Sequence, residues 1–212
     1  RTNVIQGYAN LLSSEPEEGD REWLETIRAS ADHVEETIDD VGFLVASGLD
    51  RESSLRPVAL GATLERQVRA AREAHPAADV SLRGRVPDVR VRANSRLSTV
   101  FAHLVENAIE HNDAERPGVR IEVTPDDRDR VSIRVLDDGP GIPREEQEVL
   151  LFERDIDQLH HGAGLGLLFA HWVVRVSGGD IEFGENDPRG SVVMLTFRSA
   201  AEETPEPSEG TG

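Results

Sequence analysis

Two glycine-rich segments, residues 137–143 and residues 162–167, carry the groups best suited to bind a nucleotide. The first follows an alternating apolar run that predicts a half-buried strand, so Asp137 and unshielded backbone stand at a strand end. The second leads into an apolar helical run. The first turn of a helix offers free N–H groups and a positive dipole end, which suit phosphate. One segment thus offers a carboxylate for a base, and the other offers a cradle for an anion.

A predicted helix at residues 96–111 carries a second set of polar side chains. His103, Asn107 and Glu110 follow one another along the arc opposite its apolar face, with Glu106 at their edge. A polar arc on a helix usually faces solvent and does nothing more. Asparagine is a poor helix former, however, so Asn107 one turn after a histidine suggests a function.

The charge and composition exclude several classes of protein. The net charge is −18, from 23 basic and 41 acidic residues, and every basic residue is arginine. An acidic surface without lysine argues against nucleic acid or an anionic membrane as a partner. Because there is no lysine, the chain contains neither a P-loop nor the strand lysine of a Ser/Thr/Tyr protein kinase. Because there is no cysteine, it contains no disulfide and no thiolate metal site.

The acidic excess also predicts a halophilic source, because salt screens the self-repulsion of such a surface. No apolar run approaches the roughly 18 residues of a membrane span, and no signal peptide is present. We therefore expect a cytoplasmic chain, alone or as the soluble part of a longer membrane-bound sensor. The sequence begins without methionine, which suggests a piece of a longer protein.

The N-terminal region shows the clearest helical periodicity in the sequence. Apolar residues spaced three and four apart form an a/d heptad seam: Leu24, Ile27, Ala31, Val34, Ile38, Val41 and Val45. One interpretation is an amphipathic helix on a globular core. The other, which we favour, is a helical hairpin that pairs with a second copy into a four-helix bundle, because so narrow a seam suits helix–helix packing.

The remaining patterns predict alternating helices and strands. Helices are expected near residues 64–74, at 96–111, at 145–152 and at 164–176. Strands are expected at 80–82, 89–91, 119–123, 131–135, 181–183 and 193–197, with a turn at 186–190 between the last two. The tail from Ser199 is acidic and contains two prolines, which favours disorder.

The motifs stand in the same order as in the ATP-binding domain of sensor histidine kinases, which residues 58–198 resemble. That domain shares its superfamily with gyrase, Hsp90 and MutL. The matching boxes are the Asn box at 103–112, the first glycine box at 137–143, the phenylalanine box at 151–154 and the second glycine box at 162–167. A lone GxGxG would be a weak signal, whereas four boxes in order are specific. Residues 159–174 look like haloarchaeal members, and residues 1–46 resemble the dimerisation and phosphotransfer hairpin that precedes this domain.

The resemblance implies a role for each matching residue. Asp137 would accept a hydrogen bond from the adenine amino group, and a carboxylate there favours a base edge that carries a donor. Asn107 would bind Mg²⁺, which needs only one or two protein ligands beside phosphate oxygens. Residues 144–163 would form a lid over ATP. The candidate catalytic residues are His103, Glu106 and Arg154. The candidate nucleotide-binding residues are Asn107, His111, Asp137, Gly139, Gly141, Ile142, Phe152, Gly162, Gly164, Leu165, Gly166 and Leu167.

The sequence departs from the family pattern at several positions. His103 stands where asparagine is usual, Glu110 replaces a basic residue, His111 stands at a position that is often tyrosine, and Ile156 replaces an aromatic residue. A carboxylate at position 110 is unfavourable near triphosphate unless it turns outward. The family's phosphoacceptor histidine is expected upstream of residue 1, so this chain would lack it.

The expected fold class is α+β. An ATP-binding α/β sandwich, with a mixed, mostly antiparallel sheet covered on one face by helices, would follow a helical hairpin that dimerises into a four-helix bundle. The expected domains are a truncated hairpin at residues 1–48, a linker at 49–57, the ATP-binding domain at 58–198 and a disordered tail at 199–212.

The resemblance implies the catalytic core of a two-component sensor histidine kinase. Such an enzyme transfers the γ-phosphoryl group of Mg-ATP to a histidine and then to an aspartate of a response regulator. One alternative is a non-catalytic module that binds nucleotide or merely dimerises. Another is an ATPase of the gyrase or Hsp90 kind, which needs a carboxylate base one turn before the metal-binding asparagine, where His103 stands.

Overall fold

The computed structural model describes residues 55–84, 86, 88–126, 129–143, 147 and 164–200, together with Ala31, Ile38 and Gly42. The chain divides into two compact units, Arg1–Asp50 and Arg51–Gly212. In the first unit, the three described residues are helical, in agreement with the heptad pattern. The rest of the expected hairpin lies outside the described residues, as does the expected helix at 145–152 apart from Gln147.

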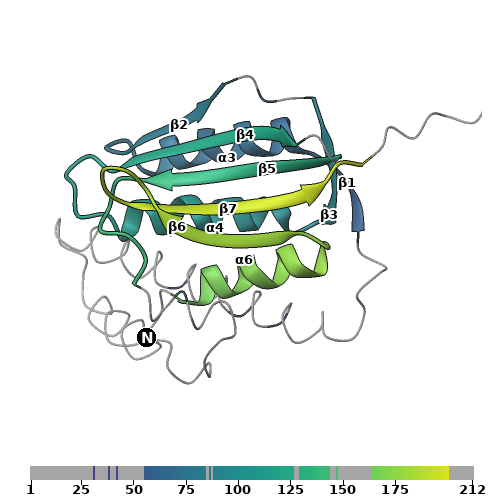
Figure 1. Cartoon of the computed structure of the whole chain (residues 1–212). Helices are drawn as coiled ribbons and strands as arrows, with labels where there is room; N and C mark the ends of the chain where they lie inside the picture. The colour runs from purple at the N-terminus through teal and green to yellow at the C-terminus, as the bar shows by residue number, and fades with distance from the viewer. Residues whose placement is uncertain are drawn as a thin grey trace, which may run out of the picture. The chain divides into compact units, whose positions relative to one another are not determined.

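The second unit is an α+β sandwich with a five-stranded sheet in the order β2-β4-β5-β7-β6 (Figure 1). The strands are β2 (Asp79–Arg83), β4 (Gly118–Asp126), β5 (Arg130–Asp137), β6 (Asp180–Glu185) and β7 (Ser191–Arg198). β2 pairs with β4 in parallel, and all other neighbours are antiparallel. The mixed, mostly antiparallel sheet expected from the sequence is therefore confirmed.

Three helices pack on one face of this sheet: α3 (Leu60–Ala74), α4 (Leu97–Glu110) and α6 (Gly164–Val176) (Figure 1). The apolar positions that predicted α4 are its buried face, with Phe101 fully buried. On β5, Val131, Ile133 and Val135 are buried, as strict alternation predicts. Burial of these two apolar surfaces against each other forms the core and sets α4 above the C-terminal end of β5.

A small second sheet extends the domain beyond the expected start at residue 58. β1 (Leu55–Ala59) pairs antiparallel with β3 (Arg90–Asn94), so residues 55–57 of the expected linker are strand. Proline weakens a strand signal, but Pro57 is tolerated because a two-stranded sheet consists of edges. The polar sequence around it is stabilised by a partner more than thirty residues away, which local patterns do not reveal.

The expected disordered tail also begins in ordered structure. Ser199 forms an antiparallel bridge with Val91, and the Ala200 N–H donates to the Arg90 carbonyl oxygen at 2.7 Å. These contacts extend the end of β7 toward β3. Residues 201–212 lie outside the described residues.

Helix α6 ends as the sequence predicts, at the Gly178–Gly179 pair. The N–H of Gly179 donates to the Val174 carbonyl oxygen, and Gly178 has a positive φ of 70°. Among the described residues, no helix is both long and apolar enough to cross a bilayer.

The buried histidine of α6 predicts a pH dependence of stability. Burial, assisted by the positive charge of Arg175, lowers the pKa of His171 below its ordinary 6.5. As the pH falls below about 6.5, the unfolded chain therefore binds a proton that the folded chain does not, and stability is lost. We expect His171→Gln to reduce the loss of unfolding free energy between about pH 7.5 and about pH 5.5, measured by urea titration. An unchanged difference would contradict a neutral, buried His171.

Candidate nucleotide-binding site

A cavity of about 330 Å³ lies between the helical layer and the sheet, at the C-terminal end of β5. Its walls come from α4, from β5 and the loop that follows it, from the start of α6, and from the start of β7. Most of the lining is apolar, including Leu104, Val135 and Val193, with a few polar groups among them. Apolar walls with a few placed polar groups are typical of small-molecule sites.

Six of the predicted nucleotide-binding residues line this one cavity: Asn107, His111, Asp137, Gly141, Ile142 and Leu167. They come from three segments that are distant in sequence, namely α4, the β5 end and the first turn of α6. The sheet register and the packing of α4 against α6 bring them together. Their roles toward a nucleotide stay predictions.

Asp137 is the last residue of β5 and continues the inward-facing side of that strand. Its Oδ1 accepts hydrogen bonds from the N–H of Gly139 at 2.9 Å and from the N–H of Ser191 at 3.1 Å. Its Oδ2 accepts a hydrogen bond from the Ser191 hydroxyl. The carboxylate is therefore fixed in one orientation at the cavity wall. Its hydrogen bond to Gly139 is the turn contact that an aspartate at this position is expected to make.

The neighbouring Asp138 turns the other way. Its Oδ1 accepts hydrogen bonds from the Asn112 amide at 2.8 Å and from the Gly118 N–H at 2.9 Å, so it links the strand end to the loop between α4 and β4. Successive strand residues point to opposite faces. Alternation along β5 could therefore have separated the two aspartates from the sequence alone.

Helix α4 divides its polar residues between several environments. Asn107 and His111 line the cavity, whereas Glu110 is exposed and does not, so position 110 brings no carboxylate to the cavity wall. Glu106 binds Nε2 of His75 through its Oε1 at 2.9 Å, which ties α4 to the end of α3. His103 packs edge-on against Phe169 of α6, with the ring centres 5.2 Å apart.

These contacts hold two of the predicted catalytic residues outside the cavity lining. Neither His103 nor Glu106 lines the cavity, because one packs between two helices and the other faces His75. A direct catalytic role for either stays a prediction. Three further predicted site residues lie outside the described residues: Phe152, Arg154 and Gly162.

The described parts of the two glycine segments lie at the end of β5 and at the start of α6. Gly141 and Ile142 line the cavity, and Gly139 supplies the N–H that Asp137 accepts. Gly164, Leu165 and Gly166 form the beginning of α6, and Leu167 reaches the cavity. A Cβ on Gly166 would lie 3.5 Å from the His103 side chain, so this glycine sits where α6 approaches α4 closely.

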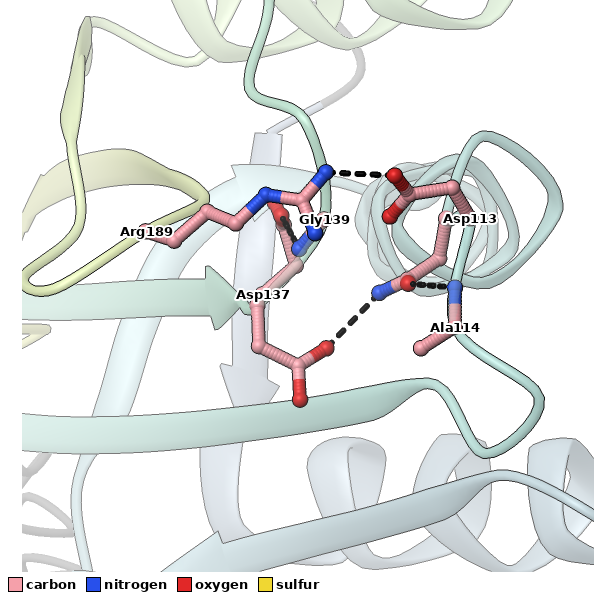
Figure 2. A network of polar contacts seen from close by, with 7 residues as sticks. Asp113, Ala114, Asp137, Gly139 and Arg189 are labelled. Atoms are coloured by element: carbon pink, nitrogen blue, oxygen red, sulfur yellow. Dashed lines mark hydrogen bonds and ion pairs between the residues drawn. The ribbon is translucent and has the colours of Figure 1, made fainter.

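The turn between β6 and β7 contributes contacts that the sequence patterns did not reveal. Besides the two bonds from Ser191, the side-chain amide of Asn186 donates to the Asp137 carbonyl oxygen at 2.7 Å. Arg189 forms an ion pair with Asp113 in the α4–β4 loop, as Figure 2 shows. The hydrogen bond from Arg189 lowers the pKa of Asp113 below its usual value. In the β5–β7 register, Leu136 pairs with Val192. This register places the turn before β7 next to Asp137, and local sequence patterns do not reveal it.

The donor and acceptor pattern of the cavity fits an adenine nucleotide. A carboxylate offers about four acceptor positions, and three of those of Asp137 are taken, which leaves room for one further donor such as an amino group. Asn107 offers an amide oxygen of the kind that Mg²⁺ accepts. Within the described ranges, no cluster of three or more His, Cys, Asp or Glu residues could hold a metal by itself.

The sandwich fold and its cavity together define a nucleotide-binding domain. Residues 93–201, slightly more than half of the 212 residues, match the histidine kinase-, DNA gyrase B- and HSP90-like ATPase family. The chain belongs to this family, and the expected ATP-binding sandwich is confirmed at that level.

The similar proteins are sensor kinases. The chain is 30% identical over 206 residues to the signal transduction histidine-protein kinase BarA of Escherichia coli, covering 89% of this chain and 22% of BarA. It is 32% identical over 189 residues to the sensor protein KdpD of Mycobacterium tuberculosis, covering 81% of this chain and 21% of KdpD. The catalytic domain of histidine kinase ThkA superposes with a TM-score of 0.58 at 26% identity, over 68% of this chain and 97% of that domain. The chain spans about a fifth of the length of BarA and KdpD.

Proposed function

We propose that this chain is the ATP-binding catalytic core of a two-component sensor histidine kinase. The observation that carries the proposal is that Asp137 and Asn107 line one apolar cavity beside the first turn of α6. Membership of the ATPase family and the similarity to histidine kinases support it.

The described side chains would divide the work of holding Mg-ATP. Asp137, fixed by Ser191 and Gly139, would accept the adenine amino group in its remaining acceptor position. The apolar walls would enclose the base, and the N–H groups of the first turn of α6 would face phosphate. Mg²⁺, held in part by Asn107, would neutralise phosphate charge. Catalysis would then consist mainly of positioning, as in phosphoryl transfer generally.

The cavity favours a kinase over an ATPase of the gyrase or Hsp90 kind. Hydrolysis needs a carboxylate that activates water, and Asp137 is the only carboxylate among the described residues that line the cavity. The Glu106 carboxylate is instead bonded to His75. A phosphoacceptor outside the domain requires no such base within it.

The proposed kinase would act as a homodimer and transfer phosphate to a response regulator. Histidine kinases as a family imply both partners. Ile38, one residue of the heptad seam, has 64% of its surface exposed, and a second copy of the hairpin would cover such an apolar side chain.

The proposal is tested with a chain extended upstream to include a candidate acceptor histidine. We expect incubation with γ-labelled Mg-ATP to give protein-bound label that is acid-labile and alkali-stable. At a nucleotide concentration below saturation, we expect Asp137→Asn in the same chain to give far less label. Nucleotide binding without label would indicate the non-catalytic module instead. Rapid release of phosphate without protein labelling would indicate an ATPase.

The acidic surface predicts that salt stabilises the protein. The net charge of −18 destabilises the compact state by self-repulsion, and salt shortens the range of that repulsion from about 10 Å at 0.1 M to about 3 Å at 1 M. We expect the melting temperature to rise by several degrees as KCl increases from about 0.1 M to about 1 M. A flat or falling curve would contradict the halophilic, haloarchaeal-like source, which stays a prediction.

A further inference from the structure

The β6–β7 turn and the residue that follows it hold both the main chain and the carboxylate of Asp137. Asn186 donates its side-chain amide to the Asp137 carbonyl oxygen, while its backbone N–H donates to the Gly190 carbonyl oxygen at 3.0 Å. Asn186 therefore closes the turn and fixes the Asp137 main chain at the same time. Ser191, the first residue after the turn, holds the two carboxylate oxygens.

A second contact ties the same turn to the helical layer. The Arg189–Asp113 ion pair joins the turn to the loop that leaves α4 (Figure 2). Each of these side chains is about half exposed, at 52% and 56%, so the pair is open to screening by salt. The turn is thus attached to β5 by Asn186 and to the α4–β4 loop by Arg189.

We propose that Asn186 and Arg189 are positioning residues that set the affinity and base selectivity of the nucleotide site. Neither lines the cavity. Asn186 would act through its bond to Asp137, and Arg189 would act by holding the turn that carries Asn186 and Ser191. With the Asp137 main chain fixed, the one remaining acceptor position of its carboxylate points in a constant direction. A base with an amino group at that point gains a charge-assisted hydrogen bond, whereas a base with a carbonyl group meets repulsion.

The inference rests on the proposed binding of adenine at Asp137, and loss of the turn contacts should reduce discrimination between bases. Without the Asn186 amide, the peptide after Asp137 is less constrained, and the Gly139 and Ser191 donors that orient the carboxylate can shift relative to it. A purely structural role would lower stability and leave the ratio of affinities unchanged. The ratio of ATP to ITP affinity separates the two roles, because ITP carries a carbonyl in place of the amino group.

The experiment measures Mg-ATP and Mg-ITP affinities of the whole chain by calorimetry. We expect Asn186→Ala to weaken ATP binding about tenfold and to narrow the ATP/ITP ratio about tenfold. The matched control is Glu185→Gln, an exposed residue at the end of β6, which should leave both affinities unchanged. Wild-type affinities for both nucleotides in folded Asn186→Ala would overturn the inference. A lower melting temperature of Asn186→Ala with an unchanged ATP/ITP affinity ratio would also overturn it.

The exposed ion pair provides a variant that does not threaten folding. We expect Arg189→Asp to weaken ATP binding about threefold at low salt and less at about 1 M KCl. Combining it with Asp113→Arg should restore most of the loss, since the reversed pair rejoins the same two loops. Failure of Arg189→Asp to alter the ATP/ITP ratio at low salt would remove Arg189 from the proposal.

These binding measurements also distinguish failure of the positioning role from failure of the proposed nucleotide binding. If the wild-type chain binds no Mg-ATP, both fall together. If the wild type binds ATP and Asp137→Asn does not, while Asn186→Ala matches the wild type, the proposed function stands and only the positioning role of the turn is wrong.

Discussion

Asp137→Asn is expected to weaken Mg-ATP binding by about 100-fold while leaving the fold intact. An asparagine oxygen can still accept from the Gly139 and Ser191 N–H groups, which now bond Oδ1. The amide nitrogen would then replace Oδ2, where a donor would face the amino group of adenine. The Ser191 hydroxyl can turn to accept from that nitrogen, so the folded state loses little. Calorimetric titration with Mg-ATP measures the effect.

Asp138→Asn is the matched control, because this neighbouring carboxylate binds Asn112 and Gly118 instead of lining the cavity. We expect its ATP affinity to stay within about threefold of the wild type. Equal losses in the two variants would mean that charge at the strand end matters and that the orientation of Asp137 does not. An unchanged affinity in Asp137→Asn would remove adenine from this cavity wall.

Gly190→Ala is expected to destabilise the domain by about 3 kcal/mol or more. Gly190 has a φ of 111°, and a Cβ there would lie 1.9 Å from the Asp137 carbonyl oxygen. That oxygen is the acceptor of the Asn186 bond, so the backbone cannot move away without breaking the turn contact. Urea and thermal unfolding measure the loss.

Gly178→Ala separates backbone strain from this close approach. Gly178 also has a positive φ, of 70°, but a Cβ there would meet nothing within 4 Å. We expect a cost of about 1 kcal/mol, from the left-handed conformation alone. Similar losses at the two positions would contradict the close approach of Gly190 to the Asp137 carbonyl oxygen.

Local patterns predicted most of the described helices and strands and named several residues that line the cavity. The alternation of Val131, Ile133 and Val135 located β5 and predicted that Asp137 lies at its end. The helical spacing around Asn107 located α4 and its buried face. Both predictions depend on the burial of one face of an element. Such burial appears in a single sequence as a periodic spacing of apolar residues.

The contacts that the sequence did not predict all join segments far apart in the chain. The Asn186 bond spans 49 residues, and β1 pairs with a strand that begins at Arg90. His103 and Asn107 lie one turn apart on α4 and share its polar arc, yet one packs on Phe169 and the other lines the cavity. The periodicity of a helix shows which residues share one face. It does not show which residues of another helix, here α6, those residues contact.

Strand β6 forms one border of the five-stranded sheet, and its residues make that border unsuited to aggregation. It carries three carboxylates: Glu182 and Glu185 are exposed, and Asp180 is paired with Arg130 and Arg175. Two molecules pairing through this edge strand would bring charged side chains together, which opposes the strand addition that begins amyloid-like growth. Concentrated solutions of the domain should therefore resist fibril formation through this border.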